Sequence, residues 1–599
     1  MTSAQAEQIQ WLDWGDQAFE EAERQDKLIL LDITASWCHW CHVMDHTTYS
    51  KPEIIRFINE RFIPVRVDGD KRPDVQDMYL LGGWPTTAWL LPDGRILTGT
   101  TYVPPEGMMY KLEEVDTLFH ENKELVTMQV TSMAAEAEAE RIEAEHSIEM
   151  IYCDALDSLS KVLTNEFDPI HGGFGIEPKF PFPDAVRFAF LRYRKTGDKA
   201  MLDMALKTLD SLMHLSDPVW GGFYRYSMTR DWSEPHYEKL LNVQAGIMDN
   251  YLEAYQVTGE DKYGETAAGI KAYVEHFLAD NANGGFYGSQ DADIVTKGTE
   301  GGLVVGESYF NKSESDRLSI GVPYVDKTIY TDWNGLMIST YLRFYQVMDD
   351  ERAREFALKT VDRLLSDNMC DGRMCHYSND GPVLKGILSD QVYFAQALVD
   401  AYEYSGNRHY LSAAESLVDF MESDLRDVVD GGYYFRTFDP HSKAEQLERH
   451  KPFDENVAAV SLLTRLGHLS GNERYRQLAE RTLRATSHPQ ATQSTVGMGF
   501  ALAVDTFVTN PLHIVLVGRK NTEEMQRMLL TSLHAYVPEK LVQILDPDAG
   551  NLSIGDLEYE ASDVPVAYVC AQNVCQPPIK DVEELALLLK NAREGRELT

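Results

Sequence analysis

The sequence predicts a multidomain protein with an N-terminal α/β domain, a central (α/α)6 toroid and a small C-terminal α/β region. Three observations predict this fold class: strand, helix and hairpin patterns in the first part of the chain, helical hairpins that repeat after residue 150, and strand–helix alternation after residue 511. A chain of 599 residues has room for about three to five structural units. We expect domains at 1–130, 151–510 and 511–599, with an Ala- and Glu-rich, solvated linker helix over 131–150.

Short apolar runs predict the strands of the N-terminal domain. These runs cover 27–34, 62–67, 86–91 and 96–102. The first run, KLILLDIT, is rich in Leu and Ile, which is typical of a buried strand. The turn residues Pro-Asp-Gly at 92–94 precede the last run and predict a hairpin. We therefore expect a compact α/β domain in which a helix follows the first strand.

Turns of similar sequence divide the central region into five helical hairpins. They lie at 193–198, 255–260, 345–350, 404–407 and 468–472. Most contain a glycine, the residue that a helix C-terminus favours in the left-handed conformation. A Gly-Gly-aromatic motif recurs between them, at 172–174, 221–223, 284–286 and 431–433. Helical hairpins repeated in this way form solenoids or closed rings. The irregular, charge-rich Gly-Gly loops favour the closed ring, and pairing of 155–163 with 497–509 as a sixth hairpin would close it.

In the C-terminal region, the order is strand, helix, strand, strand, helix. The expected segments are 513–518, 523–534, 540–545, 566–570 and 581–592. They predict a small α/β appendage to which the sequence assigns no function.

Charge and composition exclude several classes of function. The chain has 95 acidic and 55 basic side chains, a formal charge of −40, and such a field repels both nucleic acids and anionic membranes. We therefore expect neither as a partner. The N-terminal residues lack the features of a signal peptide, and no apolar stretch is long enough to span a bilayer. These features predict a soluble, cytoplasmic protein, and its 7 cysteines argue against a disulfide scaffold.

The clearest chemical motif is a C-H-W-C run at 38–41, at the junction of a strand and a helix. Residues three apart share one face in the first helical turn, so the two sulfur atoms can meet. The helix N-terminus stabilises the thiolate of Cys38, which predicts Cys38 as the attacking thiol and Cys41 as the resolving thiol. Asp32 on the preceding strand is the candidate proton relay. Pro85, just before a later strand, is the candidate cis proline that places backbone against the sulfurs.

Other interpretations of the cysteine motif stay open. With His42 the run also fits a C-x-x-C-H haem attachment sequence, which requires an export signal. A zinc site requires a second ligand pair, for which the sequence offers two C-x4-C pairs, Cys370 with Cys375 and Cys570 with Cys575. Two inert cysteines are the simplest alternative. We expect no cofactor and no metal.

Polar residues cluster near the Gly-Gly-aromatic motifs and predict a pocket in the toroid. Residues two apart in an extended segment point the same way, so Asp291 would lie beside Asp293, and His236 beside Glu238. Such groups suit general acid–base chemistry on a polyhydroxylated ligand, although Asp291 and Asp293 also fit an Asx turn. The candidate pocket residues are Lys179, Arg225, His236, Glu238, Asp291, Asp293, Glu300, Trp333 and Asn334.

Several of these motifs together resemble a known family. The runs are S-W-C-H-W-C-H-V-M at 36–44, G-W-P at 83–85, P-K-F-P at 178–181, P-H-Y-E-K at 235–239 and W-N-G-L at 333–336. They resemble the spermatogenesis-associated, thioredoxin-domain-containing family, whose bacterial members include the YyaL type. The resemblance implies a thioredoxin-like fold followed by an (α/α)6 barrel like those of six-hairpin glycosidases and N-acylglucosamine 2-epimerases. Departures from the family pattern at 238–245, 302–305 and 390–395 fall on the expected barrel pocket.

Three functional hypotheses follow. The first is a thiol–disulfide oxidoreductase-like protein whose toroid selects the target, with a protein disulfide or a thioredoxin-type reductant as partner. The second is a carbohydrate-active barrel, a hydrolase or an epimerase, that acts on a sugar-like small molecule with the N-terminal domain as an accessory. The third is a non-catalytic binding or scaffold protein.

Overall fold

The protein divides into two compact units. A computed structural model describes residues 8–121, 148–295, 302–379, 381–438, 449–550, 552–562, 564–571 and 574–593. Unit 1 comprises 1–146, 290–326 and 436–450, and unit 2 comprises 147–289, 327–435 and 451–599. Unit 1 therefore draws on two later segments in addition to the N-terminal part of the chain. The linear domain boundaries expected from the sequence stay a prediction, and most of the linker helix expected over 131–150 lies outside the described residues.

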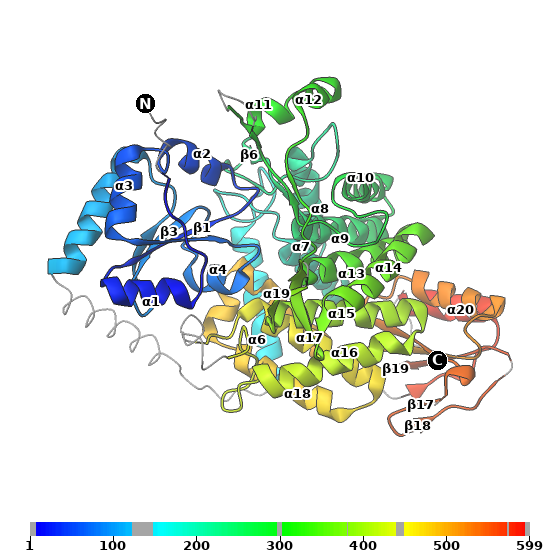
Figure 1. Ribbon diagram of the computed structural model, residues 1–599. Helices are drawn as coiled ribbons and strands as arrows, with labels where there is room; N and C mark the ends of the chain where they lie inside the picture. The colour runs from blue at the N-terminus through cyan, green and yellow to red at the C-terminus, as the bar shows by residue number, and fades with distance from the viewer. Residues whose placement is uncertain are drawn as a thin grey trace. The chain divides into compact units, whose positions relative to one another are not determined.

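Unit 1 is built on a four-stranded sheet in the order β2-β1-β3-β4 (Figure 1). Its strands are β1(Ile29–Thr34), β2(Ile63–Asp68), β3(Thr86–Leu90) and β4(Ile96–Thr100). β2 runs parallel to β1, whereas β3 is antiparallel to β1 and β4 to β3. The four apolar runs of the sequence thus form the four strands.

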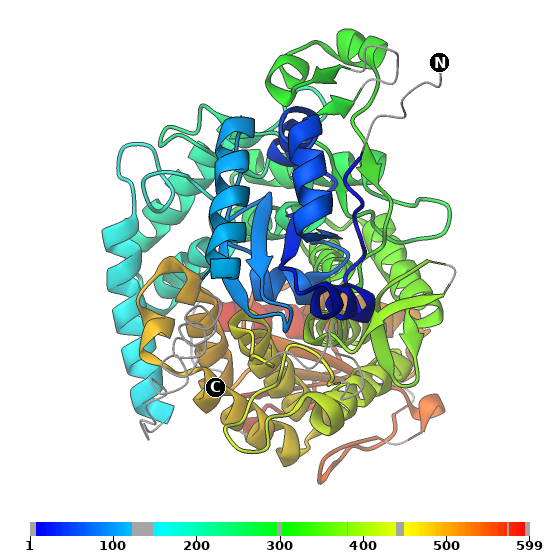
Figure 2. The ribbon, with the colours of Figure 1, turned by 60° about the vertical axis from the view of Figure 1, so that its left-hand side comes forward.

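Helices cover both faces of this sheet because β1 is apolar on both sides. Leu30 joins one buried cluster with residues of α3 and of the helical segment 105–121. Its neighbours Ile29 and Leu31 join a second cluster with residues of α1, as expected when successive strand residues point to opposite faces. Figure 2 shows α3 and 105–121 in front of the strands. The helices are α1(Asp16–Gln25), α2(His39–Thr47), α3(Pro52–Arg61) and α4(Pro73–Tyr79).

Residues 290–295 and 302–326 add small elements to unit 1. β9(Ile294–Val295) pairs antiparallel with β10(Leu303–Val304). Two short helices follow, α11(Gly306–Phe310) and α12(Glu314–Ile320). The buried guanidinium of Arg317 donates hydrogen bonds to the backbone oxygens of Lys312 and Phe310, which ties the two helices together.

Unit 2 contains a closed ring of six helical hairpins (Figure 1). Six inner helices contact one another in the order α7, α9, α13, α15, α17, α19 and back to α7, and each pairs with one outer helix. The inner helices are α7(Pro183–Thr196), α9(Leu241–Thr258), α13(Thr331–Met348), α15(Leu388–Ser405), α17(Phe453–Ser470) and α19(Met498–Val508). The outer helices, in the same order, are α8(Lys199–Leu212), α10(Asp261–Phe277), α14(Glu351–Asp367), α16(Arg408–Phe420), α18(Glu473–Thr486) and α6(Ile148–Glu166). The predicted (α/α)6 toroid is confirmed, including its closure by α6 and α19.

Three of the turns between inner and outer helices have the same capping pattern. Gly197 ends α7 in the left-handed conformation, and the Asp198 side chain accepts the Ala200 N–H to begin α8. Gly406 with Asn407 and Gly471 with Asn472 repeat this arrangement. Glycine tolerates the left-handed conformation, and Asp and Asn are favoured helix N-caps. Two adjacent residues thus stop one helix and start the next.

A repeated ion pair holds the Gly-Gly-aromatic loops, and the pairs formed by Lys179 and Lys239 are buried. In the loop at 217–223, the ammonium of Lys239 donates to Asp217 Oδ2 and to the backbone oxygen of Gly221, at 2.8 and 2.7 Å. Lys179 binds Asp168 and Gly172 in the same way, Lys451 binds Asp427 and Gly431, and Arg363 binds Asp280 and Gly284. The repeated ion pair therefore has a structural role, because each of these cations closes one of the loops.

A sheet in the order β16-β15-β19-β20 forms the core of the C-terminal region of unit 2. Its elements are β15(Leu512–Val517), α20(Glu523–His534), β16(Lys540–Leu545), β19(Val566–Ala571), β20(Val574–Cys575) and α21(Val582–Arg593). The strands and helices predicted from the sequence all appear. Cys570 and Cys575 pair across β19 and β20 and form a disulfide bond.

Candidate redox site

Cys38 and Cys41 form a disulfide bond at the N-terminus of α2 in unit 1. Cys38 is the N-cap of the helix, and its Sγ accepts the backbone N–H of Cys41 at 3.1 Å. Both cysteines are only 4% exposed. The two sulfurs therefore meet in the first turn of a helix that follows β1, as the spacing predicts. Neither cysteine forms a common site with the other two cysteine pairs named above. Cys570 and Cys575 bond to each other, and Cys370 and Cys375 are free thiols.

Aromatic side chains hold the turn that leads into the motif. Trp37 is buried, and its indole N–H donates to Asp70 at 2.6 Å. Its ring centroid lies 5.3 Å from that of Trp84. The peptide bond between Trp84 and Pro85 is cis, and β3 begins at the next residue. Trp40, in contrast, is exposed.

Asp32 is a buried carboxylate on β1 that the structure pairs with Arg66. The Arg66 guanidinium donates to Asp32 at 2.7 Å and to Asp45 at 2.6 Å, and the Tyr49 hydroxyl lies 3.4 Å from Asp32. Burial raises the pKa of Asp32 to about 6, although the charge of Arg66 opposes the rise. Sequence reasoning identified Asp32 but missed Arg66, which stands opposite it on β2 in the strand register.

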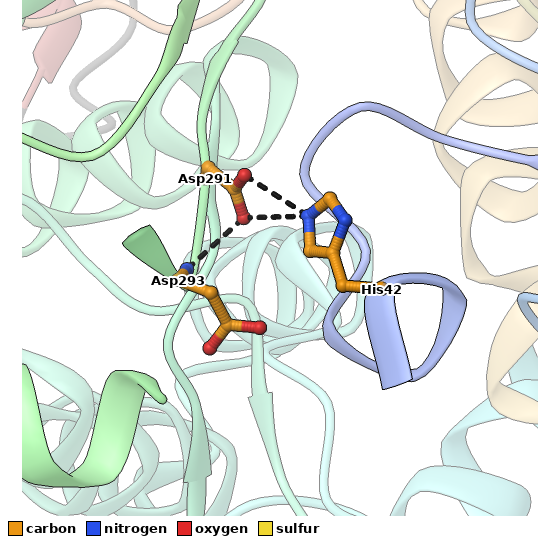
Figure 3. Close-up of side chains that lie close together, drawn as sticks. All are labelled: His42, Asp291 and Asp293. Carbon is orange, nitrogen blue, oxygen red and sulfur yellow. Dashed lines mark hydrogen bonds and ion pairs between the residues drawn. The ribbon is translucent and has the colours of Figure 1, made fainter. Parts of the chain in front are cut away.

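Both histidines of the motif pair with carboxylates far away in the sequence. His39 Nδ1 lies 2.7 Å from Asp293 Oδ2, and His42 Nε2 lies 3.0 Å from Asp291 Oδ2. Figure 3 shows the His42 imidazole and the Asp291 carboxylate pointing toward each other from α2 and from the segment between β8(Ser289–Gln290) and β9. Asp291 and Asp293 were predicted in the barrel pocket; the structure places them in unit 1, with the cysteine motif.

Opposing effects act on this cluster. Burial lowers the pKa of His42, but the hydrogen bond and charge of Asp291 and the charge of Asp293 more than offset it, so the pKa of His42 is raised. Burial raises the pKa of Asp291, and His42 only partly reverses that rise. Each carboxylate is also held by the backbone, since Asp291 Oδ1 accepts the Asp293 N–H and Asp293 Oδ1 accepts the Gly306 N–H.

In unit 2, three predicted pocket residues do come together. Arg225 donates to Glu238 Oε1 at 3.2 Å, and His236 Nδ1 lies 3.6 Å from the same oxygen. Burial alone would raise the pKa of Glu238, but His236 and Arg225 offset it and leave the pKa below its ordinary value. Glu238 Oε2 is buried without a hydrogen-bond partner among the described residues. The His236 ring stacks on Tyr226 with centroids 4.3 Å apart.

The remaining predicted pocket residues have other positions. Lys179 is buried in the loop ion pair described above. Asn334 is also buried, and its side chain accepts the Phe286 N–H and donates to the Phe286 backbone oxygen. Trp333 lies in α13 with its ring 5.3 Å from Tyr330. Glu300 lies outside the described residues.

One buried cluster of unit 2 was missed by the sequence analysis. His376 Nδ1 lies 2.9 Å from Asp390 Oδ1 and 4.0 Å from Asp332 Oδ1. Burial raises the pKa of Asp390 to about 6, with the charge of His376 opposing. Asp332 and Asp390 both lie in the first turns of inner helices, as the second residue of α13 and the third residue of α15. Acidic residues in first turns are common helix-capping features, so neither they nor His376 on β13(Arg373–Ser378) gave a distinctive signal in the sequence.

No helix in the described ranges is long and apolar enough to cross a membrane.

Comparisons with known proteins find relatives of the N-terminal domain and of the chain as a whole. Residues 1–138 match the family model Thioredox_DsbH, described as "Protein of unknown function, DUF255". The chain is 26% identical to spermatogenesis-associated protein 20 of Homo sapiens over 97% of this chain and 90% of that protein. The resemblance inferred from the sequence motifs is therefore confirmed, and the N-terminal domain is thioredoxin-like.

Two further similarities cover parts of the chain. The thiol:disulfide interchange protein DsbD of Pseudomonas fluorescens is 28% identical over 80 residues, 13% of this chain and 14% of that protein. Among solved structures, a D-mannose isomerase matches 61% of this chain and 99% of its own, at 11% identity and a TM-score of 0.49.

Proposed function

We propose that the protein is a thiol–disulfide oxidoreductase that acts through Cys38 and Cys41. The observation that carries the proposal is the disulfide bond at the N-terminus of α2, with the Cys41 N–H directed at Cys38 Sγ. A helix N-terminus favours negative charge, so it lowers the pKa of a thiol placed there and makes that thiol the better nucleophile. Cys38 is therefore the attacking residue and Cys41 the resolving one.

The reaction transfers two electrons from the dithiol to a target disulfide. The Cys38 thiolate attacks one target sulfur, so a mixed disulfide forms and the other target sulfur leaves as a thiolate. Cys41, once deprotonated, then attacks Cys38 Sγ and releases the second target thiol. The products are the Cys38–Cys41 disulfide and a reduced target, which takes up the two protons that the cysteines lose. A second thiol protein, of the thioredoxin type, restores the dithiol by the same exchange in reverse.

Asp32 is the proposed proton acceptor for Cys41. A carboxyl with a pKa of about 6 exchanges its proton near neutral pH, which suits a general base. Arg66 holds this carboxylate in place through a 2.7 Å contact. Pro85 is proposed as the backbone element that faces a bound target. The proposed compartment is the cytoplasm, in keeping with the few cysteines of the chain.

A trapping experiment tests this function. The Cys41→Ser protein, in its reduced form, is mixed with insulin as a probe disulfide, and mixed disulfides are resolved on non-reducing gels. We expect a trapped adduct through Cys38 and none with Cys38→Ser, which controls for the free thiols of Cys153, Cys370 and Cys375. Equal trapping by both variants, or none by either, would contradict the proposal.

A second candidate function rests on Glu238. Its Oε2 is buried without a partner among the described residues, and Arg225 and His236 hold its other oxygen. Such a carboxylate suits acid–base work on a sugar-like ligand. Calorimetric titration with common sugars and their phosphates tests this candidate function. Binding supports it if Glu238→Gln abolishes the binding and the control Asp231→Asn, at an exposed neighbouring residue, retains it. A screen without any heat of binding would exclude those ligands.

A further inference from the structure

We infer that His42, Asp291 and Asp293 form a binding site for a divalent transition-metal cation such as Zn²⁺ beside the redox cysteines. One donor atom from each residue lies within 4.8 Å of the other two. An imidazole nitrogen and carboxylate oxygens are ligands that zinc accepts. Figure 3 shows the His42 imidazole and the Asp291 carboxylate facing each other, with Asp293 beside them on the same segment as Asp291. The site is separate from the thiols, so it does not depend on the proposed exchange reaction.

The geometry fits a metal after a small contraction of the cluster. Donor atoms at about 2.0–2.1 Å from zinc stand about 3.3 Å apart in a tetrahedron. His42 Nε2 already lies 3.0 and 3.2 Å from the two oxygens of Asp291. Three protein ligands leave a fourth position for water or another ligand, whereas structural zinc sites usually have four protein ligands.

The groups around these ligands orient them before any ion binds. Backbone N–H groups of Asp293 and Gly306 hold one oxygen of Asp291 and one of Asp293. His39 contacts the other oxygen of Asp293 at 2.7 Å. Hydrogen bonds of this kind to metal ligands orient them and commonly change metal affinity about 10–100-fold. His39 is therefore a positioning residue in this site.

Burial and charge both favour a cation. The carboxylates of Asp291 and Asp293 are 4% and 0% exposed, whereas the His42 side chain is 19% exposed. Two buried carboxylates need compensating positive charge. A bound divalent ion would supply that charge. The partly exposed imidazole provides the open side through which an ion enters.

Zinc titration of the full-length, oxidised protein tests the inference. In that form Cys38 and Cys41 are bonded to each other and cannot ligate. Competition with a chromogenic chelator should show one equivalent of zinc that His42→Gln and Asp291→Asn both abolish, and His39→Gln should weaken its binding about 10–100-fold. His46→Gln, an exposed histidine on the same helix, is the matched control and should leave the equivalent unchanged.

Two further measurements exclude other binding sites. Co²⁺ in the same protein should show d–d bands without a sulfur-to-cobalt charge-transfer band, which excludes the remaining thiols. Asp390→Asn alters the buried cluster of unit 2 and should not affect the equivalent that depends on His42. Thermal unfolding establishes whether each variant is folded. If Asp291→Asn does not fold, His42→Gln, at a partly exposed site, still tests the inference.

The inference is wrong if the oxidised protein binds no zinc, if bound zinc is the same in His42→Gln, or if cobalt shows the sulfur band. A failed trapping experiment at Cys38 would leave the zinc result standing, because zinc is measured on the disulfide form. A failed zinc titration would likewise leave the trapping result standing.

Discussion

Asp32 shows how one buried carboxyl links the stability of unit 1 to pH. Because burial raises its pKa from the usual value to about 6, the folded state holds this proton more tightly than the unfolded state does. The sign follows from linkage: between about pH 4 and pH 6 the folded protein binds more protons, so its stability falls as pH rises through that window. Above about pH 6 Asp32 is ionised in the folded protein, and the full cost of burying its charge lowers the free energy of unfolding.

We predict that Asp32→Asn removes this pH dependence. A rise of about two pKa units corresponds to on the order of 3 kcal/mol, as an upper value. The free energy of unfolding of the variant, relative to the wild type, should therefore increase by about 2–3 kcal/mol between pH 4 and pH 7.5. Denaturant titrations of both oxidised proteins at the two pH values measure it. A difference that does not change with pH would show that Arg66 fully compensates the buried charge.

Gly222 is a residue whose replacement is expected to cost more than its conformation alone explains. It has φ of 71°, and a Cβ there would lie 2.5 Å from the Tyr273 ring. Gly259 has the same φ of 71°, and a Cβ there would have nothing within 4 Å among the described residues. The pair separates backbone strain from steric clash.

We predict that Gly259→Ala destabilises unit 2 by about 1–2 kcal/mol, the cost of a left-handed alanine. Gly222→Ala should add about 1–3 kcal/mol for the forced shift of Tyr273. Thermal unfolding of the two variants side by side checks the difference. Equal losses would mean that the Tyr273 ring moves aside without cost.

At the scale of elements, buried ion pairs close the loops between successive helical hairpins. The side chains of Lys239 and Asp217 are both 0% exposed. Removing one partner of such a pair leaves the other charge buried without compensation, which typically costs about 3–5 kcal/mol. An exposed pair in the same unit, Lys262 with Asp210, has both side chains 51% exposed and belongs to a class worth about 0–1 kcal/mol.

We predict that Lys239→Met destabilises unit 2 by about 3–5 kcal/mol and Lys262→Met by less than about 1 kcal/mol. Adding Asp217→Asn to Lys239→Met should recover part of the loss, because the unpaired charge is then gone. Denaturant unfolding of the three variants measures the free energies. Similar small losses for both lysine variants would contradict a structural role for the loop ion pair.

At the scale of the whole molecule, the core of the N-terminal domain is self-contained. Among the described residues, the members of both of its apolar clusters lie between 9 and 119. The partners of its motif histidines, Asp291 and Asp293, come instead from a later segment. The N-terminal part of the chain therefore supplies the apolar core of the domain, whereas a later segment supplies the carboxylates that pair with the motif histidines.

We predict that residues 1–138 alone fold but lack the His42-dependent zinc site. Circular dichroism should show a cooperative thermal transition, and thiol titration should show that Cys38 and Cys41 still form a disulfide. The fragment should not take up the zinc equivalent expected of the full chain. A fragment without a cooperative transition would mean that the segments 290–326 and 436–450 are needed for folding.

Local patterns in the sequence were enough to predict most of the fold. The apolar runs, the Gly-Asp and Gly-Asn turns and the cysteine spacing act between residues close in the chain, so β1 to β4, the hairpins and the meeting of Cys38 with Cys41 could be predicted. The closure of the ring by α6 and α19 followed because a sixth hairpin was missing from an otherwise regular set.

The tertiary structure alone decided which charged groups meet. The sequence around Asp291 and Asp293 predicted that they belong to a toroid pocket, but they lie in unit 1 with His39 and His42. Lys179 and Asn334 were predicted to bind a ligand, and in the structure they donate to the backbone oxygens of Gly172 and Phe286, in two of the Gly-Gly-aromatic loops. A side chain's type and spacing determine what it can bind, but its partner depends on which distant segments fold together, and hundreds of residues separate the motif histidines from their carboxylates.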